Sequence, residues 1–103
     1  VIDKVKDYVM RNYKNPEISL TSAAEFASVS TGYLSGLFKK EAGTNFVKYL
    51  TDVRMEKSMQ LLRSTDMKTY EIAYETGFSN PHYFSVSFKK YTGMSPSEFR
   101  AKE

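Results

Sequence analysis

The sequence contains no cysteine, a single histidine and no apolar run near the ~20 residues that cross a bilayer. Without cysteine there is neither a disulfide framework nor a thiolate zinc site, and this absence fits a reducing compartment. The sequence has no glycine-rich phosphate loop, Ser-His-Asp set or metal-ligand spacing, so we expect no enzyme activity, no cofactor and no metal. We expect a cytoplasmic protein that has no membrane partner and no small-molecule ligand in this domain.

The length and charge of the chain set the next limits. Its 103 residues suffice for one domain, residues 1–103, with a hydrophobic core. Fifteen basic residues against twelve acidic ones give a net charge of +3, which favours anionic partners only mildly. The chain begins with Val1 rather than Met, so we expect it to be a piece of a longer protein.

The chain repeats itself at a shift of fifty residues. Two copies separated by a long unrelated segment indicate two similar units joined by a spacer. The matched pairs are Ala23 with Ala73, Glu25 with Glu75, Ser30 with Asn80, Tyr33 with Tyr83, Leu34 with Phe84, Ser35 with Ser85, residues 38–40 with 88–90, and Gly43 with Gly93.

The first unit, about residues 19–43, is predicted to be a helix, a tight turn and a second helix. Ser19 is expected to cap a helix through Ala27, with Phe26 available to the core. The turn covers residues 28–30. Ser30 then caps a helix through residue 42, and Gly43 ends it.

The second unit, about residues 69–93, follows the same plan. A helix starting at Thr69 leads to a turn at 77–79. Asn80 caps the next helix and Pro81 takes its first position, where the missing N–H is no loss. Gly93 closes that helix, and Tyr91 is expected on its inward apolar stripe.

Three more helices are predicted outside the repeat, at 2–14, 45–63 and 96–102. The fold class is therefore all-α, with seven helices and two helix-turn-helix subdomains bridged by a long central helix, as in a homeodomain-like protein. The central helix is roughly 27 Å long and is expected to set the separation of the two units. Together with the turns, this length roughly matches the distance of about 34 Å between adjacent major-groove faces.

The second helix of each unit, at residues 31–42 and 81–92, has a face with no apolar residues required for the core. Both outward faces combine small or polar residues with a lysine pair and carry no carboxylate in their first ten positions. These features suit a helix that enters a DNA major groove. The predicted DNA-binding residues are Thr31, Gly32, Tyr33, Ser35, Gly36, Lys39, Lys40, Pro81, His82, Tyr83, Ser85, Val86, Lys89 and Lys90.

Within this set the lysines, with the helix N-terminal amides at Thr31 and His82, are expected to hold phosphates. A lysine pair can also be an ordinary solvated face, but its recurrence at the same place in both units favours DNA. The tyrosines, Tyr33 and Tyr83, suit packing or phosphate bonding equally.

Several other residues have two interpretations. His82 fits surface capping as well as base contact, and the two glycines, Gly32 and Gly36, can allow close approach of the backbone to DNA. Arg54 in the central helix suits an internal packing or ion-pair role better than DNA contact.

The pattern resembles the C-terminal DNA-binding domain of the AraC/XylS family of bacterial transcription regulators, over about residues 1–100. Residues 52–57 and 81–84 are similar to output domains of YesN-type two-component response regulators. The residues that carry the resemblance are Tyr33, Leu34, residues 38–41, Gly43, Phe46, Tyr49, Leu50, Arg54, Leu61, Leu62, Ile72, Ala73, Gly77, Phe78, Tyr83, Phe84, Phe88, Lys89, Gly93, Pro96, Phe99 and Arg100.

The resemblance implies sequence-specific binding of double-stranded DNA, with two recognition helices in successive major grooves. It also implies an upstream receiver or sensor domain missing from this chain, and RNA polymerase as a partner if the regulator is an activator. The base-facing positions that the resemblance implies are Gly32, Ser35 and Gly36 in the first unit and His82, Tyr83, Ser85 and Val86 in the second. They lack the arginine, asparagine and glutamine that read bases best, so we expect specificity to depend on DNA shape, a partner protomer or tandem sites. The alternative function is a helix-turn-helix fold reused as a protein-interaction module; RNA binding is less favoured, since no stacking platform is evident.

Overall fold

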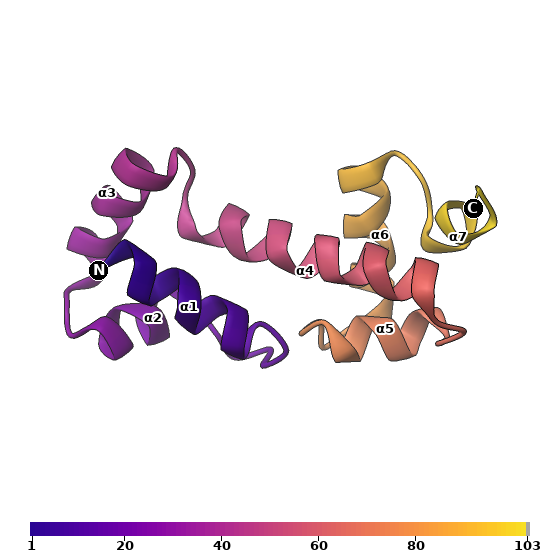
Figure 1. Cartoon of the computed structure of the whole chain (residues 1–103), viewed down its shortest axis with the longest axis horizontal. Helices are drawn as coiled ribbons and strands as arrows, with labels where there is room; N and C mark the ends of the chain where they lie inside the picture. The colour runs from indigo at the N-terminus through magenta and orange to yellow at the C-terminus, as the bar shows by residue number, and fades with distance from the viewer. Residues whose placement is uncertain (103) are drawn as a thin grey trace. The chain divides into compact units, whose positions relative to one another are not determined.

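The computed structural model describes residues 1–102, which form seven α-helices and no strand (Figure 1). The all-α, seven-helix prediction is therefore confirmed. The predicted ends of two helices differ slightly from the structure, because the first helix stops at residue 12 and the fourth spans 46–64. The helices are α1 (Ile2–Asn12), α2 (Leu20–Ala27), α3 (Thr31–Ala42), α4 (Phe46–Ser64), α5 (Thr69–Glu75), α6 (Pro81–Thr92) and α7 (Pro96–Lys102).

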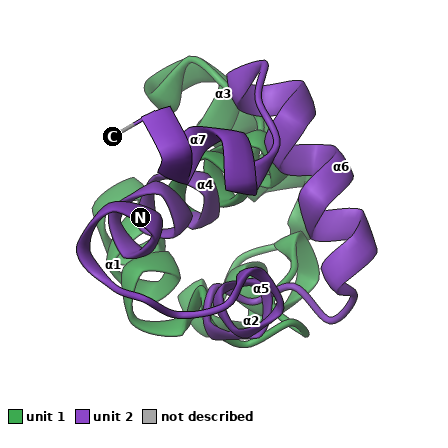
Figure 2. Cartoon of the chain, turned by 90° about the vertical axis from the view of Figure 1, so that its right-hand side faces the viewer, with its two compact units in different colours: residues 1–53 green, residues 54–103 purple. Residues whose placement is uncertain are grey.

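The chain divides into two compact units, residues 1–53 and 54–103, and the boundary falls inside α4 (Figure 2). Unit 1 contains α1, α2, α3 and the first part of α4. Unit 2 contains the rest of α4 with α5, α6 and α7. The two ends of the long helix α4 thus belong to two separate hydrophobic cores.

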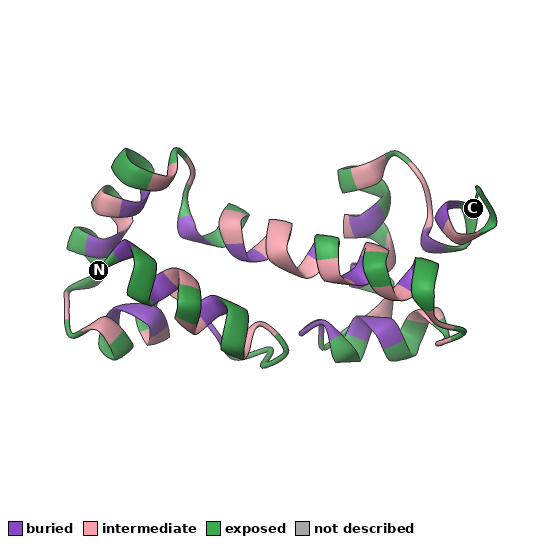
Figure 3. Cartoon of the chain, in the orientation of Figure 1, coloured by how far each residue is buried: buried purple, intermediate pink, exposed green. Residues whose placement is uncertain are grey.

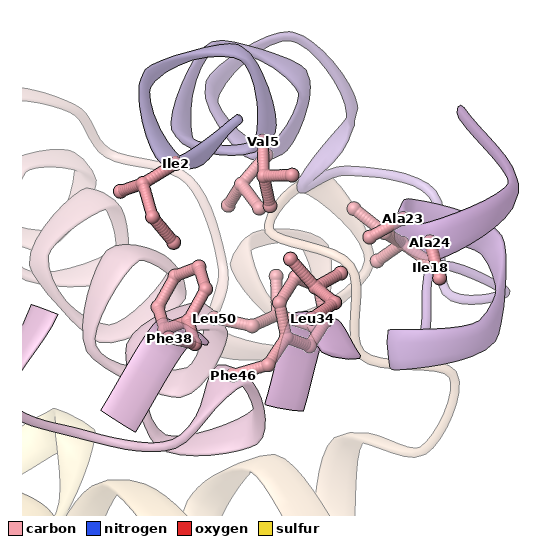
Figure 4. Packing of buried hydrophobic residues seen from close by; sticks show 10 residues of the cluster. Ile2, Val5, Ile18, Ala23, Ala24, Leu34, Phe38, Phe46 and Leu50 are labelled. Carbon is pink, nitrogen blue, oxygen red and sulfur yellow. The ribbon is translucent and has the colours of Figure 1, made fainter. Parts of the chain in front are cut away.

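In unit 1 the core forms where α1, α2, α3 and the start of α4 meet. Figure 4 shows Ile2 of α1 and Leu50 of α4 around Phe38 of α3. The ring of Phe38 makes edge contacts with those of Phe46 and Tyr49, at centroid distances of 5.8 and 5.4 Å. These rings bury large apolar areas, and edge-to-face pairs add stabilisation beyond burial.

Unit 2 repeats this plan with different side chains. Its buried positions on α4, Met55, Ser58 and Leu62, have the same spacing as Ile2, Val5 and Val9 on α1. The unit's aromatic contacts run from Phe78 through Phe84 and Phe88 to Phe99, with centroid distances between 5.1 and 5.7 Å.

Two residues assigned to the core by periodicity lie at the surface. Phe26 is 45% exposed and stacks on Tyr8 at 4.6 Å. Its position is about 110° around α2 from the centre of the buried stripe at 100° per residue. Tyr91 is 40% exposed in the last turn of α6, and its equivalent in α3 is the exposed Glu41, so this end of the helix extends past the core in both units.

The first helices of the two motifs are α2 and α5. In the structure their equivalent residues are not the ones paired by the sequence repeat at a shift of fifty. The amide of Val29 donates to the carbonyl of Ala24 at 3.0 Å, and the amide of Phe78 donates to that of Ala73 at 2.9 Å. The equivalent of Ala73 is therefore Ala24, and the predicted match with Ala23 is wrong by one residue.

The turn of unit 2 makes up the difference. Ser28 (φ 59°) and Gly77 (φ 96°) take the left-handed conformation at equivalent places. One residue separates Ser28 from the N-cap Ser30, whereas two separate Gly77 from the N-cap Asn80. The extra residue in the second turn restores the shift of fifty from the N-caps onward.

Arg100 joins α7 to the segment that follows α4. Its guanidinium donates three hydrogen bonds to main-chain carbonyls: Nε to Leu62 at 3.1 Å, Nη1 to Met67 at 2.7 Å and Nη2 to Thr65 at 2.9 Å. The three donors of the guanidinium thus hold the end of α4 and the residues that follow it against α7.

We expect Arg100→Met to lower the free energy of unfolding by about 1–2 kcal/mol, because three carbonyls are deprived of charged donors. The matched control is Arg11→Met, since Arg11 makes only an exposed i,i+4 ion pair with Asp7 and should cost under ~0.5 kcal/mol. Urea unfolding of both variants measures the difference. Equal effects would show that Arg100 adds nothing beyond surface charge.

Candidate nucleic-acid interface

The helices α3 and α6 begin on side-chain caps. Ser30 Oγ accepts from the amide of Tyr33 at 3.1 Å, and Asn80 Oδ1 accepts from the amides of His82 and Tyr83 at 2.9 and 3.1 Å. Both caps were predicted from sequence and are confirmed. Such caps satisfy first-turn donors that have no partner inside the helix.

The Asn80 cap corrects one detail of the expected phosphate site. The His82 amide already donates to Asn80 Oδ1, so it is not free to bind a phosphate, contrary to the expectation from sequence. The phosphate contact expected of this amide is therefore not available at the start of α6.

The core fixes how each of these helices is rotated. Leu34 and Phe38 of α3 are fully buried, as are Phe84 and Phe88 of α6. Since a helix buries one stripe, the positions on its opposite side must face solvent. Figure 3 shows buried and exposed segments alternating along both helices.

The two helices expose the same positions. From 31 to 43 and from 81 to 93, the burial class differs only at the first position, where Thr31 is exposed and Pro81 is half-buried. None of the predicted contact residues is buried. The exposed ones are Thr31, Gly32, Tyr33, Gly36, Lys39, Lys40, His82, Tyr83, Val86, Lys89 and Lys90, and the half-buried ones are Ser35, Pro81 and Ser85.

The side chains of Tyr33 and Tyr83 lie mainly in solvent. Of the two roles expected from sequence, this exposure favours hydrogen bonding to a phosphate over packing in the core. Tyr33 is 55% exposed and Tyr83 is 62% exposed. The Tyr83 ring still lies 6.3 Å from that of Phe78, so its orientation is partly held by the core. Each phenol hydroxyl can donate to a phosphate oxygen.

The electrostatic pattern of the two helices is alike up to the lysine pair, after which α3 carries the exposed Glu41 where α6 carries Tyr91. Neither has an acidic residue in its first turn, and each carries its lysine pair in the last turn, where cations also complement the helix dipole. The pKa of Glu98 is lowered by hydrogen bonds from the Ser95 amide and hydroxyl, and further by the positive charge of Lys89. The lysine pair of each helix can attract anions, whereas the Glu98 carboxylate offsets part of the charge of Lys89.

The exposed face of α3 is hollowed. An open depression is lined by Gly32, Tyr33, Gly36, Leu37 and Lys40. A Cβ atom added at Gly32 or Gly36 would meet no atom within 4 Å. Leu37 is half-buried: it packs against the core of unit 1 and also contributes to the hollow.

Arg54 takes the packing role that the sequence favoured. Its guanidinium carbon lies 5.8 Å from the centroid of the Phe78 ring, a cation–π contact within unit 2. Burial lowers the pKa of this guanidinium from its ordinary value. Arg54 is therefore part of the support for the turn of unit 2.

Neither a metal-binding cluster of side chains nor a membrane-spanning helix is found in residues 1–102. No group of three or more histidine, aspartate or glutamate side chains in this range lies close enough to hold a metal ion. None of the helices in the same range is both long and apolar enough to cross a membrane.

Comparison with known proteins yields consistent matches. A family profile described as a helix-turn-helix domain matches residues 23–102. The chain is 44% identical over 106 residues to the uncharacterized transcriptional regulatory protein YesN of Bacillus subtilis, an alignment that covers 100% of this chain and 29% of YesN. The chain spans about a third of the length of the curated relatives it matches.

Solved structures share the fold over nearly the whole chain. The C-terminal domain of AraT, a response regulator from Geobacillus stearothermophilus, superposes with a TM-score of 0.97 at 39% identity, covering 99% of this chain and 84% of that one. The DNA-binding domain of AdpA, a global transcriptional factor solved with a target DNA, has a TM-score of 0.92 at 22% identity, covering 97% and 89%. The likeness to AdpA is one of fold.

We expect Gly36→Ala to raise the free energy of unfolding by about 0.5–1 kcal/mol, because the site is open and glycine weakens a helix interior. The matched variant is Gly43→Ala in the same unit, where φ is +72°. It should lower stability by about 1 kcal/mol, since alanine is strained there. Thermal unfolding measures both, and a destabilising Gly36→Ala would contradict the open face of α3.

Proposed function

The chain belongs to the AraC-type helix-turn-helix family, and from this we propose that it binds double-stranded DNA sequence-specifically as the output domain of a bacterial transcription regulator. The observation that carries the proposal is the repeated exposed face of α3 and α6, capped at its start, free of early carboxylates and edged by two lysines. AdpA, which shares the fold, was solved with its target DNA.

In this proposal the lysines of both helices bind phosphates. Lys39, Lys40, Lys89 and Lys90 are all exposed, and each phosphate they neutralise releases condensed counterions from the duplex. The phenols of Tyr33 and Tyr83 and the Thr31 amide add phosphate contacts. These contacts orient the helices but carry no sequence information.

The rest of each exposed face approaches the bases. On α6, His82 can hydrogen-bond a base edge and Val86 can contact a thymine methyl group, while Ser85 lies beside them. On α3 the corresponding positions are Gly32 and Gly36. We propose that the two helices enter successive major grooves, because one continuous helix, α4 of 19 residues, joins the two motifs.

Regulation lies outside this domain. The curated relatives are transcription regulators about three times longer than this chain, so we propose that a receiver or sensor domain supplies the signal. RNA polymerase is the proposed partner if the regulator is an activator. We further propose that the protein acts in the cytoplasm and that this domain has no enzyme activity.

The salt dependence of binding tests the phosphate role of the lysines. We expect Lys39→Ala and Lys89→Ala each to weaken binding to every duplex sequence and to reduce the slope of log K against log salt by about one unit. Fluorescence anisotropy with a random duplex at several salt concentrations measures the slope.

Lys102→Ala is the charge-matched control, because Lys102 is exposed but lies on α7. It should leave the slope close to that of the wild type. A slope unchanged in both recognition-helix variants would remove these lysines from the interface. Absence of any salt-dependent binding by the wild type would favour the alternative, a protein-interaction module.

A further inference from the structure

We propose that the two recognition helices divide their work: α6 selects bases through His82 and Val86, whereas α3 binds the DNA backbone and groove shape without selecting bases. This inference rests on the proposed function, since it assigns roles within the same interface. It predicts an operator with one half-site of defined sequence and a second half-site that contributes affinity but little sequence preference.

The first step is a comparison of the two exposed faces. Five positions are exposed in residues 32–40, and the same five are exposed in residues 82–90. Three of the five are identical in the two helices: the tyrosine and both lysines. The remaining two differ, with Gly32 replaced by His82 and Gly36 by Val86. Among the exposed positions of these two ranges, a difference in base preference can come only from these two; the half-buried Leu37 also differs from its equivalent Ser87, and Thr31 from Pro81, at the start of the helix.

The second step is the chemistry at those positions. Residues 82 and 86 are four apart, so their side chains lie on one face of α6, one turn from each other. An imidazole can donate to or accept from a base edge, and a valine can pack on the methyl group that distinguishes thymine. A glycine offers only hydrogen atoms, so α3 has no side chain at the equivalent places to reach a base.

The third step is the hollow on α3. Gly32 and Gly36 have open space where a side chain would lie, so no internal packing requires glycine there. Glycine at such positions nevertheless weakens the helix. What these glycines provide is a shallow surface, lined on one side by Tyr33 and Lys40, that lets the helix backbone come close to a groove. Such a surface follows groove width and deformability rather than base identity.

The serines do not restore base selection to α3. Ser35 and Ser85 are identical and equally half-buried, so they contribute alike to both units. A serine hydroxyl also bonds to several base edges without strong preference. Among the exposed positions of residues 32–40 and 82–90, the asymmetry between the units therefore remains at the two paired positions.

The test is selection from random duplexes with the wild-type chain and two double variants. In His82→Ala/Val86→Ala the preferred block of bases should disappear, and the ratio of specific to random binding should fall on the order of tenfold for each base pair no longer recognised. Salt-dependent binding to random duplex should persist. In Gly32→His/Gly36→Val a second preferred block should appear, about one helical turn from the first and similar in sequence.

The matched control is Glu41→Tyr, which transfers the next exposed difference between the helices and should leave the selected sequence unchanged. Circular dichroism of each variant checks that the helices are retained; alanine at 82 and 86 favours the helix, so folding should not obscure the result. A preferred block that survives His82→Ala/Val86→Ala, or a transplant that leaves the wild-type selection unaltered, would overturn the division of work. Loss of salt-dependent binding by the wild type would instead refute the proposed function.

Discussion

Burial of one phenylalanine in the middle of each recognition helix is the constraint on which the interface depends. Phe38 packs against Tyr49, and Phe88 packs against Phe99, with ring centroids 5.4 and 5.5 Å apart. Each contact joins the recognition helix to the helix that follows it. Because the buried stripe sets the rotation of the helix about its axis, it also sets which side chains face outward. Two different cores therefore present the same exposed positions.

The helix ends add a second constraint on the interface. Asn80 directs its side-chain oxygen to two amides of α6, which stabilises the helix but removes those amides from the set that can bind an anion. Gly43 and Gly93 end the two helices in the left-handed conformation directly after the lysine-bearing turns. The cationic side chains are thus placed at the ends of short, well-defined helices, where the proposed phosphate contacts depend on them.

Sequence reasoning predicted the seven helices, the caps Ser30 and Asn80 and a face of contact residues that the core leaves unburied, because these follow from local patterns that tertiary structure did not override. Sequence reasoning failed where contacts with other parts of the chain determine the burial or the position of a residue. Periodicity could not show that Tyr91 lies beyond the end of the core or that the second turn contains one more residue. It also missed the buried hydroxyls of Ser58 and Thr76, which hydrogen-bond each other at 3.3 Å, because polar residues give no hydrophobic signal.

The central claim is that the exposed faces of α3 and α6 form the DNA-binding surface. The most direct measurement is an NMR titration of the isotope-labelled chain with a duplex at low salt, following every backbone amide. We expect the largest shift changes at residues 31–40 and 81–90, with small changes along α1. Changes concentrated on α1 and around the exposed Phe26, with the two recognition helices unaffected, would contradict the account.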